Sequence, residues 1–169
     1  TNTLPNIIAG HSLGEYSALV AADSIKLKDA ISLVHKRGLF MESSEKGSMF
    51  AILNLDLSFV IDICNEVSIA TGLVVSPANI NSPNQIVIAG NEEAAVIAAD
   101  RCKDKGAKRC IKLRVGAASH CMLMKAASES LLAELSSIHF NELSIPIIHN
   151  YDASIESSSI NLVDKLTSQ

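Results

Sequence analysis

The chain of 169 residues lacks tryptophan, has few aromatic residues (4%) and carries no excess of basic ones. Its net charge is −4, so no basic surplus is available to neutralise nucleic-acid phosphates. Few aromatic rings are available to stack on bases. No apolar run reaches the about 18 residues that a membrane-spanning helix requires. We therefore expect that neither nucleic acid nor a membrane is a partner of this chain.

Cysteine pairs with the spacing of a metal or redox motif are also missing. Four cysteines are present, and none of them forms a C-x-x-C pattern. The first residues lack the basic start and apolar core of a signal peptide. We therefore expect free thiols, no bound metal and a cytoplasmic location. Hydrophobic residues make up 48% of the chain and charged residues 19%, which predicts a packed globular core.

A serine between two glycines follows the first apolar stretch. Residues 6–10 (NIIAG) predict a short buried strand, residues 10–14 read GHSLG, and residues 15–25 predict a helix. G-x-S-x-G between a strand and a helix is the context of a nucleophile elbow, in which a sharp turn exposes the Ser12 hydroxyl so that it can attack a substrate. The N–H of Leu13, at the start of the helix, could then donate to an oxyanion. The alternative is an ordinary tight turn.

The next segments predict a second helix and then a separate subdomain. Residues 27–45 have Ala30, Ile31, Val34 and Met41 at helical spacing. The elements expected after them are a strand at 48–55, a helix at 58–70, strands at 73–80 and 85–90, a helix at 91–106 capped by Asn91, and a strand at 107–115. This β-α-β-β-α-β order is that of a ferredoxin-like unit.

The remaining residues return to the first subdomain. They predict a turn at 116–120, a helix at 122–138, a strand at 144–150 that could pair with the first one, and a polar tail that ends in a short helix. The fold class is thus α/β: a hydrolase-like parallel-sheet subdomain, residues 1–47 and 116–169, with a ferredoxin-like subdomain, residues 48–115, inserted. Because the larger layer has so few strands, we expect the chain to be an excerpt of a longer polypeptide.

A serine nucleophile needs a base, and five histidines are available. His120 is the best candidate because it lies in a turn of small residues just before a helix. His11 is expected to pack away from the serine, and His35 to be solvated. For His139 and His149, beside the late strand, core or surface roles are the default.

Arg37 lies on or beside the apolar stripe of the second predicted helix. One interpretation is a side chain that snorkels to solvent or forms an internal salt bridge. The other is a clamp for a substrate carboxylate, because guanidinium binds carboxylate through two parallel hydrogen bonds.

Several segments together resemble the malonyl-CoA:acyl carrier protein transacylases and the related acyltransferase domains of polyketide synthases. They are GHSLGEYSALVAA, LVHKRGLFM, NINSPNQIVIAG, GAKR, SHCMLMKAA and IPIIHN, and they extend over nearly the whole chain. The resemblance implies the same two-subdomain fold. It also implies transfer of a malonyl group from malonyl-CoA to the phosphopantetheine thiol of acyl carrier protein, in fatty acid biosynthesis, with no cofactor or metal.

The resemblance also assigns residues. It implies that Ser12 is the nucleophile, His120 the base and Arg37 the malonate-binding residue. Met41 should line the acyl pocket, and the backbone N–H of Leu13 should be one oxyanion donor. Asn81 is expected near the coenzyme A end of the substrate.

Some features of the family are missing from this sequence. The glutamine that completes the oxyanion hole and the residue that orients the histidine are expected outside the chain, and Ala118 stands where the family often has proline. One alternative is a serine thioesterase or esterase, which would need a triad carboxylate; Asp152 is the only loosely placed candidate. The other alternative is an excerpt that folds but does not react.

Overall fold

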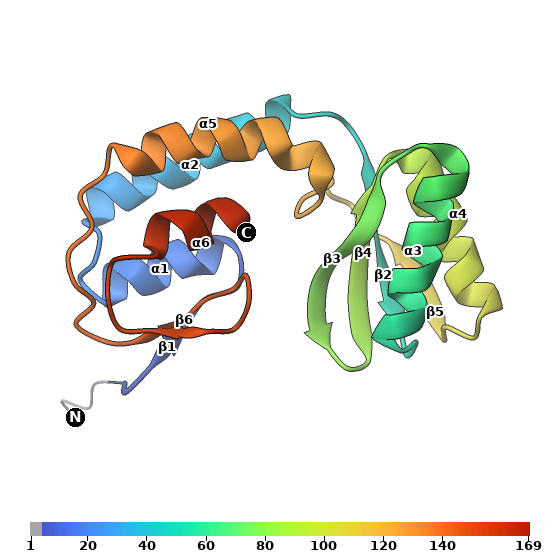
Figure 1. Cartoon of the computed structure of the whole chain (residues 1–169), viewed down its shortest axis with the longest axis horizontal. Helices are drawn as coiled ribbons and strands as arrows, with labels where there is room; N and C mark the ends of the chain where they lie inside the picture. Colours follow the sequence, from blue (N-terminus) through green and yellow to red (C-terminus); the bar gives the residue numbers. More distant parts are fainter. Residues whose placement is uncertain (1–4) are drawn as a thin grey trace. The chain divides into compact units, whose positions relative to one another are not determined.

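The computed structural model describes residues 5–169, so the first four residues of the predicted subdomain 1–47 lie outside it. The chain divides into two compact units. The first comprises residues up to 40 together with 127–169, and the second comprises residues 41–126. Figure 1 shows that the second unit is formed by one continuous middle segment of the chain.

The first unit contains a small sheet with helices packed against it (Figure 1). Its strands are β1 (Ile8–Ala9), β6 (Ile147–Ile148) and β7 (Ile155–Glu156), in the order β1-β6-β7. The β1 and β6 strands are parallel, as the sequence predicts, and β7 is antiparallel to β6. Its helices are α1 (Leu13–Ala21), α2 (Leu27–Ser43), of which the last residues belong to the second unit, α5 (Lys125–Ser136) and α6 (Leu162–Ser168).

Apolar residues from every helix of the first unit form one core. Tyr16 and Leu19 of α1 meet Leu33 of α2 in a cluster that also contains side chains of α5, α6 and β6. Lys36 of α2 forms an ion pair with Glu134 of α5 at 2.5 Å. The core therefore fixes α1 and α2 relative to each other, which positions the residues at the start of α1.

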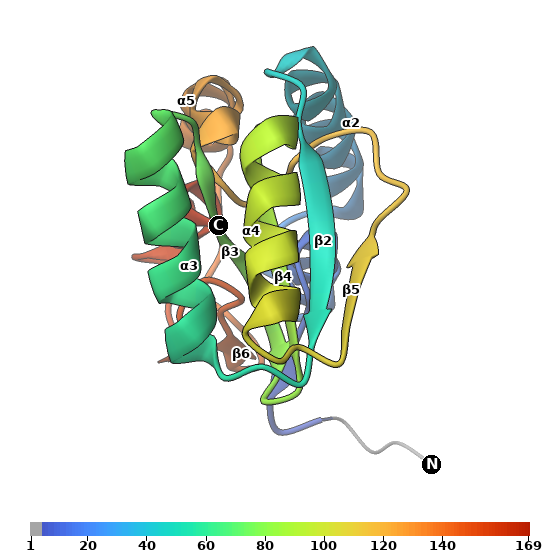
Figure 2. The same ribbon diagram turned by 90° about the vertical axis from the view of Figure 1, so that its right-hand side faces the viewer.

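The second unit is a four-stranded antiparallel sheet with two helices on one face, as Figure 2 shows. In chain order its elements are β2 (Ser48–Leu53), α3 (Leu57–Thr71), β3 (Val75–Ser82), β4 (Gln85–Gly90), α4 (Glu92–Asp104) and β5 (Arg109–Lys112). The order of strands in the sheet is β3-β4-β2-β5. A short 3-10 helix, Met122–Met124, leads into α5.

The central strands of this sheet are buried on both faces. Phe50 pairs with Ile88, and both side chains belong to the cluster shared with α3 and α4. Met49 pairs with Ala89, and these belong to a second cluster with Leu123. Because successive side chains point to opposite faces, two buried faces require apolar residues at nearly every position. This requirement explains the unbroken apolar runs in β2 and β4.

Most elements predicted from the sequence are present, with some differences in detail. Ile31, expected on the buried stripe of the second helix, is 61% exposed, because Ala30 and Leu33 are the residues that enter the core. Asn91 is the N-cap residue of α4, as predicted, but its side chain makes no capping hydrogen bond; its Oδ1 accepts from the N–H of Val74 instead. The strand β7 was not expected, since its two residues lie in a polar, serine-rich tail.

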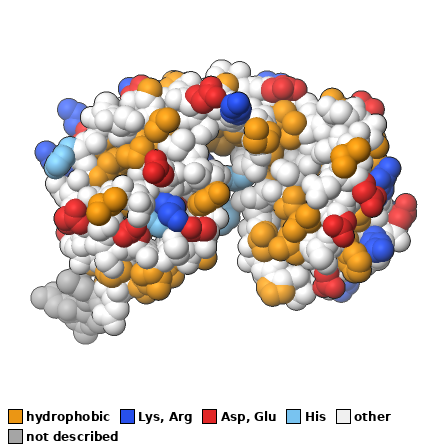
Figure 3. Space-filling view, viewed as in Figure 1, with side chains coloured by type: hydrophobic (Ala, Val, Ile, Leu, Met, Phe, Trp, Pro, Cys, Tyr) orange, Lys and Arg blue, Asp and Glu red, His pale blue; other side chains and the backbone are white. Residues whose placement is uncertain are grey.

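Within residues 5–169, no helix combines the length and apolar character that crossing a membrane requires. The same residues contain no group of three or more His, Cys, Asp or Glu side chains placed to hold a metal ion. Figure 3 shows hydrophobic side chains interspersed with charged ones on the visible face of each unit.

Candidate active site

Ser12 joins β1 to α1 in a strained backbone conformation. Its φ is 53° and its ψ is −113°, a combination that residues with a Cβ rarely adopt. Such a conformation costs about 1–3 kcal/mol and persists only where the surrounding structure enforces it. The sharp strand-turn-helix junction that the sequence predicts around Ser12 is therefore present.

The two glycines of the GHSLG segment differ in what the packing demands of them. A Cβ on Gly10 would lie 2.1 Å from the carbonyl carbon and oxygen of Gly14 and 2.5 Å from the nitrogen of Glu15. A Cβ on Gly14 would meet no heavy atom within 4 Å among the described residues. Glycine is therefore required at position 10 and not at position 14, because only at position 10 does the backbone lie too close to Gly14 and Glu15 to leave room for a Cβ.

The hydroxyl of Ser12 is not used to cap α1. A serine at this position often accepts a hydrogen bond from a backbone N–H of the first turn, but Ser12 makes no such side-chain cap. Instead, Nη2 of Arg37 donates to the Ser12 Oγ at 3.1 Å. The same nitrogen donates to Oε1 of Gln169 at 3.4 Å. The guanidinium of α2 thus lies against the hydroxyl at the start of α1.

Glu15 is a buried carboxylate one turn after Ser12, with 1% of its surface exposed. It accepts hydrogen bonds from His149 Nδ1 at 2.7 Å, from the backbone N–H of Asn150 at 3.0 Å and from Gln169 Nε2 at 2.8 Å. The N–H of Ser12 in turn donates to Oδ1 of Asn150 at 2.5 Å. We call Glu15, His149, Asn150 and Gln169 the Glu15 network.

The Glu15 network was not predicted from the sequence. His149 was expected in a core or surface role, and no role was expected for the other three residues. His149 is buried, and no partner of its Nε2 was found within the described residues. One signal was present: Glu15 is a charged residue at the start of an otherwise apolar helix, and a buried charge requires partners.

Tyr16 follows Glu15 and is also buried. Burial raises the pKa of the Tyr16 hydroxyl to about 12; the nearby Arg37 guanidinium lowers it and the Glu15 carboxylate raises it by smaller amounts. The Arg37 and Glu15 side chains are therefore both close enough to Tyr16 to change the pKa of its hydroxyl. At neutral pH the tyrosine is fully protonated, so it is not a candidate base.

His120 lies in the second unit, in the turn before the 3-10 helix. Its backbone is left-handed, with φ 61°, and its side chain is partly buried. The next residue, Cys121, donates from Sγ to the carbonyl oxygen of Ala118 at 3.1 Å, and burial raises the pKa of its thiol. A histidine in a constrained turn has a fixed backbone direction, as a positioned base requires.

The other candidate residues occupy different parts of the chain. Leu13, the first residue of α1, is 50% exposed, and its backbone N–H is at a position where helices have no internal acceptor. Met41 packs at the edge of the core cluster that contains Met49 and Leu123. Asn81, near the end of β3, donates from Nδ2 to Oε1 of Gln85 at 3.0 Å and is exposed.

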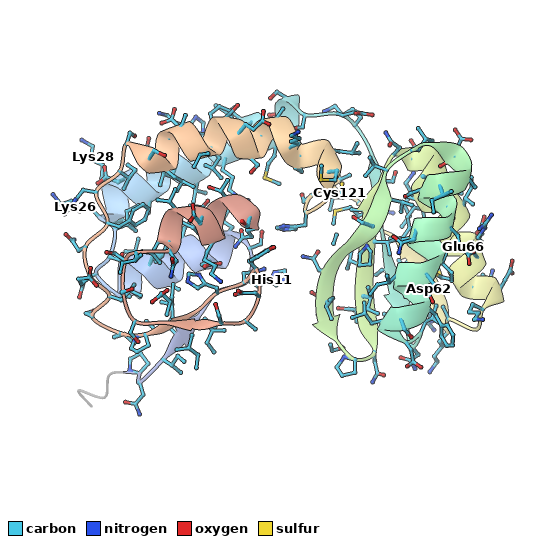
Figure 4. All side chains as sticks on the ribbon, in the orientation of Figure 1. His11, Lys26, Lys28, Asp62, Glu66 and Cys121 are labelled. Atoms are coloured by element: carbon cyan, nitrogen blue, oxygen red, sulfur yellow. The ribbon has the colours of Figure 1, made fainter. Side chains whose placement is uncertain are left out.

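The remaining candidates can be compared with their expected roles. His11, which was expected to pack, is exposed instead; Figure 4 labels it at the turn before α1. His35 and His139 are exposed, in agreement with a solvated role. Asp152, considered as a triad carboxylate, hydrogen-bonds Ser154 in its own turn and pairs with Lys165 of α6. Those contacts hold the carboxylate within the C-terminal segment.

A strained serine at a strand-helix junction is the arrangement of a nucleophile elbow, and an arginine lies against its hydroxyl. The family model described as "Acyl transferase domain" matches residues 3–164. The chain therefore belongs to the acyl transferase domain family.

Named relatives make the relationship more specific. The malonyl CoA-acyl carrier protein transacylase of Escherichia coli K12 is 46% identical over 168 residues, which are 98% of this chain and 54% of the relative. The protein of the same name from Bacillus subtilis 168 is 39% identical, over 98% of this chain and 53% of the relative. The chain thus spans about half the length of these curated relatives.

Solved structures give the same result. The malonyl CoA-acyl carrier protein transacylase of Coxiella burnetii matches with a TM-score of 0.93 and 37% identity, over 98% of this chain and 53% of that chain. A malonyl-transacylase solved in complex with its type II PKS acyl-carrier protein matches with a TM-score of 0.93 and 44% identity, over 98% of this chain and 54% of that one. The mixed α/β fold is therefore shared with these transacylases.

Proposed function

We propose that the polypeptide carrying these residues is a malonyl-CoA:acyl carrier protein transacylase that acts through a malonyl-serine intermediate. One observation carries the proposal: Nη2 of Arg37 lies 3.1 Å from the Ser12 hydroxyl. A cation so close to a nucleophile can pair with a carboxylate only a few bonds from the carbonyl under attack. Malonyl thioesters have that spacing, with one methylene between the two carbonyl carbons.

The proposed reaction has two halves. His120 takes the proton of Ser12 Oγ, which attacks the malonyl thioester carbon; the carbon–sulfur bond breaks, and His120 returns the proton to the coenzyme A thiolate. His120 then takes the proton of the phosphopantetheine thiol of acyl carrier protein, and the sulfur attacks the serine ester; the carbon–oxygen bond breaks, and His120 returns the proton to Ser12 Oγ. The N–H of Leu13 donates to the oxyanion in both halves. No metal or cofactor takes part.

Further assignments follow the family resemblance and are proposals too. Met41 lines the acyl pocket, and Asn81 lies near the coenzyme A end of the substrate. The second unit is a ferredoxin-like subdomain, with predicted boundaries 48–115, inserted into a hydrolase-like subdomain. Its β-α-β-β-α-β order and antiparallel pairing support this. We also propose that the protein works in fatty acid biosynthesis in the cytoplasm.

Intact-protein mass after brief exposure to malonyl-CoA tests the proposal. The experiment uses the full-length natural polypeptide that contains this sequence. We expect one malonyl adduct, absent in Ser12→Ala and discharged when acyl carrier protein with its phosphopantetheine arm is added. Ser17→Ala, in the same helix at an exposed position, is the matched control and should keep the adduct. A folded protein that never forms the adduct would refute the covalent mechanism.

A further inference from the structure

The Glu15 network contacts two of the residues to which the proposed function assigns chemistry, Ser12 and Arg37. We infer that Asn150 and Gln169 are positioning residues held by the buried Glu15 carboxylate: Asn150 fixes the backbone of the nucleophile, and Gln169 fixes the arginine that holds the substrate carboxylate. The inference rests on the proposed function for the reaction it concerns. The hydrogen bonds that carry it all lie within the first unit.

The first connection runs from Glu15 to the backbone of Ser12. The N–H of Asn150 donates to Glu15 Oε2 at 3.0 Å, and the Asn150 side chain accepts from the Ser12 N–H at 2.5 Å. Ser12 needs such a partner because its left-handed backbone would otherwise relax. Asn150 therefore ties the strained residue to the loop after β6, and the direction of the hydroxyl depends on that contact.

The second connection runs from Glu15 to Arg37. Gln169 donates from Nε2 to Glu15 Oε2 at 2.8 Å and accepts from Arg37 Nη2 at 3.4 Å. Nη2 also donates to Ser12 Oγ. Two acceptors on one nitrogen fix the plane of the guanidinium, and that plane decides how a carboxylate can bind through two parallel hydrogen bonds.

A carboxylate is the side chain that suits the centre of this network. Glu15 receives three donors, and an ionised carboxylate can accept all of them because it has no hydrogen of its own. With the carboxylate ionised, the histidine Nδ1 is the donor in its 2.7 Å contact with Glu15 Oε1. A glutamine at position 15 would direct an NH₂ group at one of these donors and break that contact.

The two connections predict different kinetic effects. Loss of the Asn150 contact should slow acylation of Ser12 by every acyl donor, because it misdirects the nucleophile. Loss of the Gln169 contact should weaken donors with a free carboxylate more than neutral donors, because only the former would pair with Arg37. A purely structural role for these residues would lower stability without separating the two kinds of donor.

The experiment measures Ser12 acylation in the full-length natural polypeptide, using malonyl-CoA and the neutral ester p-nitrophenyl acetate. We expect Asn150→Ala to slow acylation by both donors about tenfold, the effect of removing one orienting hydrogen bond. Gln169→Ala should raise the KM for malonyl-CoA about five- to tenfold and change the rate with the neutral ester by a clearly smaller factor. Asn141→Ala is the matched control, because that amide donates to the carbonyl of Asp23 in the same unit.

Equal effects of Gln169→Ala on the two donors, or wild-type rates in Asn150→Ala, would overturn the inference. Hydrogen exchange of the Ser12 amide gives a test that needs no activity. Exchange should accelerate at least tenfold in Asn150→Ala and not in Asn141→Ala, and equal exchange in all three proteins would overturn the Asn150 assignment. A wild-type protein without any Ser12 adduct would instead refute the proposed function, while the exchange measurement would still decide the contact.

Discussion

Replacing Gly10 by alanine should destabilise the first unit far more than the same change at Gly14. The Gly10 Cβ would lie 2.1 Å from backbone atoms of Gly14, more than 1 Å inside ordinary van der Waals contact at about 3.5 Å. Because the neighbour is backbone and not a flexible side chain, β1 and α1 must move apart. Overpacking of this kind costs about 1–3 kcal/mol or more, and we expect about 3.

Gly14→Ala is the matched control and should have the opposite sign. Its Cβ meets nothing within 4 Å, and the position is the second residue of α1. Alanine is about 1 kcal/mol better than glycine in a helix interior and less than that in the first turn, so at most a small gain is expected. The two variants, identical in the atoms they add, should therefore differ by about 3 kcal/mol in the free energy of unfolding.

Tyrosine fluorescence during urea unfolding measures this difference. The chain has no tryptophan and two tyrosines, and both of these, Tyr16 and Tyr151, belong to the first unit. The signal therefore reports on the unit that contains the substituted glycines. Equal unfolding midpoints for Gly10→Ala and Gly14→Ala would refute the argument that close approach selects glycine at the first position only.

Two further predictions concern ionisable groups. Burial raises the pKa of the Cys64 and Cys102 thiols to about 12, so at pH 8 these thiols should react with a disulfide reagent only after unfolding; rapid labelling of all four cysteines in the native protein would contradict this. Hydrogen bonds from Lys165 and Ser154 hold the pKa of Asp152 well below its ordinary value. A lowered native pKa stabilises the fold above the unfolded pKa of about 4 and loses that effect as pH falls. In Lys165→Met, the Asp152 carboxyl should therefore titrate at higher pH by NMR, and an unchanged titration would refute the assigned cause.

Local patterns in the sequence predicted most elements of the fold. The strands β3 and β4, which are separated by a turn of two residues, and the strand-turn-helix at Ser12 rest on interactions within a few residues. Parallel pairing of β1 with β6 was also predicted, because a strand apolar on both faces needs a neighbour. The strand β7 was not predicted because its two residues lie in a polar, serine-rich tail with no apolar run.

The arginine was found from the sequence because helical spacing placed it beside the core face of its own helix. Its contact with the Ser12 hydroxyl, however, depends on how α2 packs against α1. Spacing along one helix predicts which face a residue occupies, but it does not identify what that face meets.

The sequence by itself determined the candidate nucleophile, the arginine and the order of elements, because each depends on residue type and short spacing. The tertiary structure decided the Glu15 network, whose members are brought together across 134 to 154 residues of chain. No local period records such a contact, since any buried glutamate would need partners and the sequence does not say which residues supply them. The two glycines of GHSLG differ for the same reason. The sequence pattern contains both, but the tertiary packing requires glycine at position 10 alone.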